Sequence, residues 1–257
     1  MINLIIIGIA VMCLMALAVV LFVIMYQRRV ILHQLEIKTL DEKKQMELLR
    51  ASLQSEEEER RRIAAELHDD VGATLSSVRL FLHQAEKNSS DAAIIHQSGE
   101  LVDESIRKIR DISHKLQPAL LETLGLYASL QALADLYTHS GSITIRVQPE
   151  QHLPRLVDYH ELHIYRIIQE LINNCVRHSK STGISIRISS VGRTLLISLD
   201  HDGMGITNDE YESLRKEKNG IGLKNISNRL QFIQGEISFN KKEDATYRIQ
   251  MNIPINS

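Results

Sequence analysis

Apolar and polar residues follow three different patterns along the chain. Residues 4–25 contain no charged side chain and are almost all aliphatic. From residue 29 to about residue 117 the apolar residues recur at helical spacing, and beyond Pro118 helical runs alternate with runs in which every second residue is apolar. The pattern predicts an apolar helix, then amphipathic helices, then an α+β domain.

The apolar run is long enough to cross a bilayer. At about 1.5 Å per residue, a helix over residues 4–25 spans a hydrocarbon core of roughly 30 Å. Arg28 and Arg29 follow it directly, so the positive-inside rule places the N-terminus outside and the rest of the chain in the cytoplasm. We therefore predict residues 1–28 as a single-pass transmembrane anchor in the inner (cytoplasmic) membrane, without an extracellular sensor domain. A cleaved signal peptide fits less well, because the charges lie on the wrong side of the run.

Residues 29–58 predict a helical stalk, since they are highly charged and contain neither Pro nor Gly. Glutamates at 56–58 each precede an arginine by four residues, which supports a helix. One heptad frame is apolar at five of its seven core positions: Met46, Leu49, Leu53, Glu56, Arg60, Ile63 and Leu67. A parallel coiled coil in a homodimer is the favoured interpretation, and a solvated single helix is the alternative.

Residues 59–118 predict an antiparallel helical hairpin. The apolar periodicity continues to Leu82, and the polar residues 87–91 predict a turn in which Ser90 or Asp91 caps the next helix. A second amphipathic stretch ends at Pro118. One hairpin has too small a core to stand alone, so we expect two copies to pair into a four-helix bundle.

Residues 119–257 predict an α+β sandwich, one sheet covered on one face by helices. The predicted helices are 124–139, 158–178 and one after Gly222. The predicted strands are 143–147, 184–188, 195–199, 236–239 and 246–253.

Composition excludes some classes of function. The 257 residues carry a net charge of −2, so no basic field indicates nucleic-acid binding. The two cysteines, Cys13 and Cys175, lie far apart and form neither a disulfide framework nor a metal-ligand pattern.

Three segments carry candidate chemistry. In the first, E-R-R-R-I-A-A-E-L-H-D-D (residues 59–70), His68 lies at the edge of the apolar seam. An imidazole with a pKa of about 6.5 is largely neutral and nucleophilic at pH 7. Asp69 can hold its tautomer and accept the second ring proton. Taken alone, a His–Asp pair on a helix is more often a surface pair.

The second segment is R-I-I-Q-E-L-I-N-N-C-V-R-H (residues 166–178). Glu170, Asn174 and His178 are spaced by four and share one helix face. Carboxylate and amide oxygens suit Mg²⁺, and Arg177 can meet a phosphate. A polar helix face toward solvent is the alternative.

The third segment has two glycine pairs. Gly203 and Gly205 follow a strand in H-D-G-M-G, and Gly220 and Gly222 precede a helix in N-G-I-G-L. Glycines let backbone approach a ligand, and a helix N-terminus favours phosphate. The polar residues 207–219 between the pairs predict a flexible lid over a nucleotide site.

Together and in this order, the three segments resemble the sensor histidine kinases, specifically the nitrate-sensor-like subfamily. The first resembles its H box, E-R-x-R-I-A-x-E-L-H-D, and the second its N box, R-I-x-Q-E-x-x-x-N-x-x-[KR]-H. The third resembles the two glycine boxes. L-Q-P-A-L-L (116–121) and L-G-L (124–126) match the subfamily's junction. The resemblance runs from about Glu56 to the C-terminus.

The resemblance implies a dimeric helical bundle followed by the GHKL (Bergerat-type) ATP-binding sandwich shared with gyrase B and the Hsp90 chaperones. His68 would be the phosphoacceptor and Asp69 its base, while Asn174 and Glu170 would bind Mg²⁺. The other residues that it implies at the ATP site are Arg177, His178, His201, Asp202, Gly203, Gly205, Gly220, Gly222, Leu223 and Thr246.

Three positions depart from the family pattern. His201 stands where the family has an aspartate that contacts the adenine amino group, with Asp200 and Asp202 on either side. Ala73 stands where the subfamily often has a glutamine used to dephosphorylate the partner. Ala245 stands in place of a glycine in the last Gly-Thr box.

The implied function is a membrane-bound histidine kinase that phosphorylates His68 from Mg-ATP and passes the phosphoryl group to an aspartate of a separate response regulator. The membrane helix and stalk would either sense a signal or only tether the kinase. Two other classes stay open: a GHKL-type ATPase without phosphotransfer, and a pseudokinase that scaffolds a partner.

Overall fold

The computed structural model describes residues 2–86, 92–139, 141, 143–149, 156, 158–217, 220–242 and 246–255. Near the N-terminus the side chains at 2–11, 13, 16 and 18 lie outside that description. The chain divides into two compact units, Met1–Ser52 and Leu53–Ser257.

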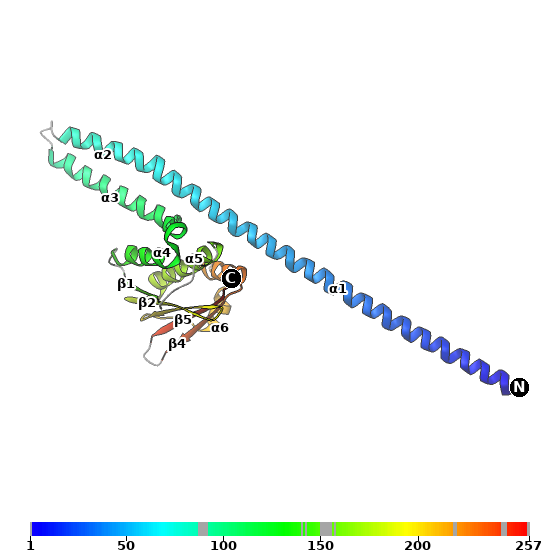
Figure 1. Ribbon diagram of the computed structural model, residues 1–257. Coiled ribbons are helices and arrows are strands. Elements are labelled where there is room, and N and C mark those ends of the chain that lie inside the picture. The colour runs from blue at the N-terminus through cyan, green and yellow to red at the C-terminus, as the bar shows by residue number, and fades with distance from the viewer. Residues whose placement is uncertain are drawn as a thin grey trace. The chain divides into compact units, whose positions relative to one another are not determined.

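The N-terminal part of the chain is one long helix, α1 (Ile2–Glu66), drawn in blue to cyan in Figure 1. It contains the predicted stalk, whose helical character is thereby confirmed. The segment predicted as an anchor forms its first turns. Among the described residues, no helix combines the length and the hydropathy that crossing a membrane requires.

The predicted hairpin consists of a π-helical turn, η1 (Leu67–Val71), followed by α2 (Gly72–Glu86) and α3 (Ala92–Leu116). The two helices run side by side in Figure 1. Between them, Arg79 Nε donates to both carboxylate oxygens of Asp103 at 2.9 Å. The turn predicted at residues 87–91, with its capping Ser90 or Asp91, lies outside the described residues.

The C-terminal domain is built on a five-stranded mixed sheet in the order β1-β2-β3-β5-β4. β1 and β2 are parallel, and the other pairs are antiparallel. The strands are β1 (Thr144–Pro149), β2 (Gly183–Val191), β3 (Thr194–His201), β4 (Glu236–Lys241) and β5 (Tyr247–Pro254).

The main helices of this domain are α4 (Ala119–His139), α5 (Asp158–Asn174) with a π-helical turn η2 (Cys175–Ser179) at its end, and α7 (Ile221–Phe232). Every second residue of β3 is buried, from Leu195 to His201, which is the alternation of a sheet with one covered face. Fully buried residues of α5, such as Ile164, Ile168 and Ile172, belong to the same core. The predicted α+β sandwich is confirmed.

Three local predictions need correction. α4 begins at Ala119 rather than Leu124, with a kink at Gly125 (φ 82°) that lets the chain turn within it. α7 begins at Ile221, so Gly222 lies inside its first turn. The segment predicted as a lid contains a helix that was not predicted, α6 (Asn208–Leu214), which Thr207 caps by accepting from the Glu210 N–H at 3.3 Å. Residues 218–219 of that lid lie outside the description.

Candidate active site

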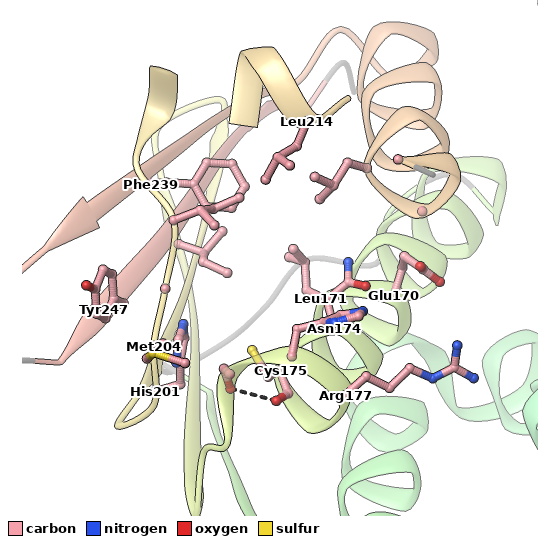
Figure 2. Close-up of a pocket in the computed structure, with 18 of the residues that line it drawn as sticks. Glu170, Leu171, Asn174, Cys175, Arg177, His201, Met204, Leu214, Phe239 and Tyr247 are labelled. Carbon is pink, nitrogen blue, oxygen red and sulfur yellow. Dashed lines mark hydrogen bonds between the residues drawn. The ribbon is translucent and has the colours of Figure 1, made fainter. Parts of the chain in front are cut away.

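A cavity of about 610 Å³ opens in the C-terminal domain. Its walls come from α5, η2, the end of β3, the residues around α6, the start of α7, and strands β4 and β5 (Figure 2). Nine of the residues predicted at the ATP site line it: Glu170, Asn174, Arg177, His178, His201, Gly205, Gly220, Gly222 and Leu223. This size is typical of small-molecule sites.

One wall is polar and comes from the second sequence segment. Glu170 and Asn174 project from α5, and Figure 2 shows Arg177 beyond them along the same stretch of chain. Arg177 and His178 are exposed and belong to η2 and not to α5, but both line the same cavity as Glu170 and Asn174. A π-helical turn adds a residue to the turn and changes which way later side chains face.

Asn174 has an unmet hydrogen bond. Its Nδ2 is, within the described part of the chain, the one fully buried side-chain nitrogen or oxygen without a partner. Amide nitrogen and oxygen are assigned from surrounding hydrogen bonds, and here the protein does not fix which atom faces the cavity. The side chain therefore lacks a polar partner that a ligand can supply.

The donor set fits a magnesium ion held jointly with a phosphate. Glu170 and Asn174 offer hard oxygen ligands on one wall. The described residues contain no group of three or more His, Cys, Asp or Glu side chains placed to hold a metal alone. Mg²⁺ commonly takes one or two protein ligands and completes its shell with water and substrate phosphates, so these residues match that mode.

Two glycines keep the cavity open by close approach. A Cβ at Gly205 would overlap the ring of Tyr247, and a Cβ at Gly222 would overlap Oε1 of Glu170. Gly222 also lies in the first turn of α7, where free backbone N–H groups favour an anion. The cavity thus places a helix N-terminus beside the candidate metal ligands.

The wall opposite Glu170 and Asn174 is apolar and aromatic. Figure 2 shows Met204, His201 and Tyr247 there, with Phe239 and Leu214 further along. The His201 ring is 4% exposed and stacks on Tyr247, with 5.8 Å between ring centroids and 14° between planes. Burial lowers the pKa of His201, so the ring is neutral at pH 7.

Three predicted nucleotide residues do not line the cavity: Asp202, Gly203 and Thr246. The Asp202 carboxylate instead accepts from the backbone N–H groups of Thr182 at 2.8 Å and Gly183 at 3.0 Å. A Cβ at Gly203 would overlap the Ser179 carbonyl, so this glycine permits packing behind the wall.

His68 and Asp69 lie on η1 and are both exposed, as the sequence predicted for His68. The N–H of Gly72 donates to the carbonyl of Leu67 across the π-helical turn. No described residue of the hairpin lines the cavity. The structure therefore presents the His–Asp pair and the cavity as two separate sites, and each of them adjoins a π-helical turn.

A buried ionic cluster between α1, α3 and α5 was not predicted from the sequence. Arg166 pairs with Glu57, with side chains 2% and 9% exposed, and its Nε donates to Glu57 Oε2 at 3.0 Å. Beside this pair, Arg229 of α7 lies 2.9 Å from Glu56. The one available signal was the presence of Glu56 and Arg60 at core positions of the heptad frame.

Burial alone would raise the pKa of Glu56, but Arg229 and Arg60 hold it below its usual value. The Glu56 carboxylate is therefore ionised at pH 7 and serves as a counter-ion to both arginines. This cluster attaches the C-terminal domain to the end of the stalk helix. On α5, Arg166 of the cluster lies one turn before Glu170, which lines the cavity.

Comparisons with known proteins give two family matches. A family described as "Histidine kinase" matches residues 59–121, and one described as "Histidine kinase-, DNA gyrase B-, and HSP90-like ATPase" matches residues 159–257. The first match includes the His–Asp pair, and the second includes the residues that line the cavity.

Two curated relatives are similar over most of the chain. Sensor histidine kinase MctS of Rhizobium johnstonii is 29% identical over 214 residues, covering 79% of this chain and 46% of the relative. Sensor histidine kinase ComP of Bacillus subtilis is 27% identical, covering 78% of this chain and 27% of the relative. This chain thus spans half or less of the length of either relative.

Among solved structures, the histidine kinase domain of a blue-light activated histidine kinase of Erythrobacter litoralis is similar at 16% identity and a TM-score of 0.46, over 71% of this chain and 94% of that one.

Proposed function

Because the chain belongs to the histidine kinase family, we propose that it transfers the γ-phosphoryl group of ATP to His68, and from there to an aspartate of a separate response regulator. The observation that carries the proposal is the cavity, which brings nine sequence-predicted nucleotide residues together in the same chain as an exposed His–Asp pair. Both features are needed for a kinase, and neither suffices alone.

The cavity has the parts that a nucleoside triphosphate requires. Glu170 and Asn174 would hold Mg²⁺ against the phosphates, and the ion would offset the charge on the transferring group. Arg177 and the N-terminus of α7 add positive potential on the phosphate side. The slot between Met204, Tyr247 and Phe239 would take the base.

The chemistry at His68 is a displacement at phosphorus. A ring nitrogen attacks the γ-phosphorus, the bond from phosphorus to the bridging oxygen of ADP breaks, and a P–N bond forms. Asp69 accepts the proton from the other ring nitrogen. Because no described hairpin residue lines the cavity, the ATP-binding domain must move relative to a hairpin before transfer.

The proposed dimer rests on the hairpin's surface. Leu80, Phe81 and Leu101 are large apolar side chains that remain 60–68% exposed in a single chain. Such a surface is costly in water, and pairing two hairpins into a four-helix bundle would bury it.

We also propose that residues 4–25 tether the chain to the inner membrane, with residue 29 onward in the cytoplasm. The support is the uncharged apolar run followed by Arg28 and Arg29. Replacing residues 1–28 with an unrelated membrane anchor tests whether this segment senses a signal. Loss of regulation supports sensing, and unchanged regulation reduces the segment to a tether.

The activity is tested by incubating the protein with γ-labelled ATP and looking for acid-labile, base-stable label. We expect label in the wild type, none in His68→Gln, and full label in His83→Gln, which changes another partly exposed histidine of the same hairpin. ATP hydrolysis without labelled protein would favour the ATPase. Neither activity would favour the scaffold.

A further inference from the structure

A second, smaller cavity joins the buried ionic cluster to the candidate metal site. Its volume is about 20 Å³, which leaves room for little more than a water molecule. Four charged residues of the cluster line it: Glu56, Arg60, Arg166 and Arg229. Glu170 lines both this cavity and the large one. The charges of the cluster therefore lie directly behind the glutamate that is proposed to bind Mg²⁺.

Glu170 has arginines nearby but forms no ion pair with them. Arg166 lies four residues before it on α5, so the two side chains share one face of the helix. Arg229 lines the same small cavity from α7. Even so, no hydrogen bond or ion pair joins the Glu170 carboxylate to a residue that the structure describes. Its negative charge is therefore available to a cation from outside the protein.

The stalk helix supplies the partners that keep these arginines away from Glu170. The Arg166 side chain, 2% exposed, pairs with Glu57. The Arg229 side chain, 4% exposed, lies 2.9 Å from Glu56. Burial lowers the pKa of Arg229, and of the charges around it Glu56 opposes that change most. Each of the two buried arginines of the ATP-binding domain therefore has its counter-ion on α1.

The charge balance beside the candidate metal site depends on these two pairs. The domain alone contributes two buried arginines and Glu170, which is an excess of positive charge. The two stalk glutamates offset both arginines, so the charge that remains is that of Glu170. Without the stalk glutamates, a released arginine would either pair with Glu170 or repel a divalent cation bound there.

We propose that Glu56 and Glu57 are positioning residues for Mg²⁺: by holding the two buried arginines of the domain, they keep Glu170 free to bind the metal of Mg-ATP. The inference rests on the proposed function, in which the cavity binds Mg-ATP through Glu170 and Asn174. It makes the metal affinity of the ATP site depend on contact with the stalk helix. The docked state is then the state that loads Mg-ATP, and displacement of the stalk lowers the affinity for the metal rather than for the nucleotide.

The test measures binding of ATP to the full-length protein in detergent by calorimetry, in the presence of Mg²⁺ and in the presence of EDTA. Glu56→Gln keeps a hydrogen-bond acceptor for Arg229 but removes the charge. It should weaken binding of Mg-ATP about tenfold, the effect of one uncompensated charge on a neighbouring equilibrium. Binding of metal-free ATP should be unchanged or tighter, because a released arginine attracts phosphate. A merely structural role of Glu56 would weaken both.

Two further variants isolate the charge. Glu58→Gln removes a carboxylate two residues along the same helix, where Glu58 is exposed and accepts from Gln54 at 2.9 Å. It should change the affinity for neither form of ATP. The double variant Glu56→Gln/Arg229→Gln removes the released cation as well, so it should regain the Mg-ATP affinity of the wild type. Thermal unfolding of each variant reports whether its fold is intact.

Three results overturn the inference: an equal loss of Mg-ATP and metal-free ATP binding in Glu56→Gln, an unchanged preference of that variant for Mg-ATP, or a double variant that binds Mg-ATP no better than Glu56→Gln does. If the wild type labels His68 while Glu56→Gln binds Mg-ATP normally, the stalk glutamates are not positioning residues and the kinase stands. If the wild type binds ATP under neither condition, the proposed function is wrong as well.

Discussion

The Arg166–Glu57 pair should be the most sensitive contact between the stalk helix and the ATP-binding domain. All five N–H donors of Arg166 are used. Two go to the Glu57 carboxylate, and the rest go to the carbonyls of Lys115 and Leu116 and to Gln169. Every hydrogen-bond acceptor of the buried guanidinium is therefore an oxygen atom of the protein. We predict that Glu57→Ala is strongly destabilising.

The magnitude follows from burial. Glu57→Ala leaves two donors of a 2% exposed guanidinium without partners and removes its counter-ion. Breaking a buried pair in this way costs about 3–5 kcal/mol. A matched control lies four residues along the same helix: Arg61 pairs with Glu122 at 3.3 Å, with side chains 51% and 70% exposed. Glu122→Ala should cost less than about 1 kcal/mol.

The assay is urea unfolding of each full-length variant, followed by circular dichroism, with the free energy of unfolding extrapolated to water. Glu57→Gln is a further control, since its amide oxygen can still accept from Arg166, and it should fall between the two alanine variants. If Glu57→Ala and Glu122→Ala lower the free energy equally, the buried pair does not hold the domains together and the reasoning from burial is refuted.

Three other predictions concern the core, the cavity and the dimer. Burial and Arg229 lower the pKa of His163 to about 4, below its unfolded value of about 6.5. The neutral ring therefore stabilises the fold above pH 6.5, and this contribution is lost as the pH falls toward 4, with about 2 kcal/mol lost by pH 5. Unfolding measured as a function of pH should show this loss in wild type and not in His163→Gln. Gly222→Ala should push the Glu170 side chain aside and weaken Mg-ATP binding about tenfold, with little change in stability. The control Gly183→Ala, where an added Cβ would have its nearest neighbour at 3.9 Å, should bind Mg-ATP normally in calorimetry. Equal effects of the two substitutions would contradict the inference that Gly222 is needed for its close approach to Glu170. Phe81→Ser should weaken self-association in sedimentation experiments, and an unchanged dimer would place the interface elsewhere.

Elements with a long apolar period were predictable from the sequence. The stalk, both hairpin helices, α5 and the five strands repeat their apolar positions often enough to be recognised. α6 has seven residues and buries only Tyr211, so no period could reveal it. Its capping box, Thr207 with Glu210, was nevertheless readable. The π-helical turns at residues 67–71 and 175–179 were not, because each has only five residues and is too short to show a period of its own.

Charge pairing was predicted less well, for an energetic reason. Of the three pairs expected at a spacing of four, Glu56–Arg60 forms at 3.0 Å. Arg62 pairs instead with Glu59 and Glu66, Glu57 with Arg166, and Arg61 with Glu122. An exposed pair along a helix is worth only about 0.3–0.5 kcal/mol, so a partner from another element readily displaces it. Sequence spacing cannot show which partners the fold supplies.

The helix α5 links the two halves of the candidate machinery. Arg166 and Gln169 bind the end of α3 and the stalk helix, and Glu170 and Asn174 line the cavity one turn later. Arg166 and Glu170 are about 6 Å apart along a rigid helix, with no flexible segment between them. A displacement of the stalk at Glu57 must therefore either move the candidate metal ligands or break the buried pair. A broken pair leaves a desolvated charge, so positions of the domain between docked and undocked are high in free energy. We therefore expect the domain to occupy discrete docked and undocked states rather than a continuum.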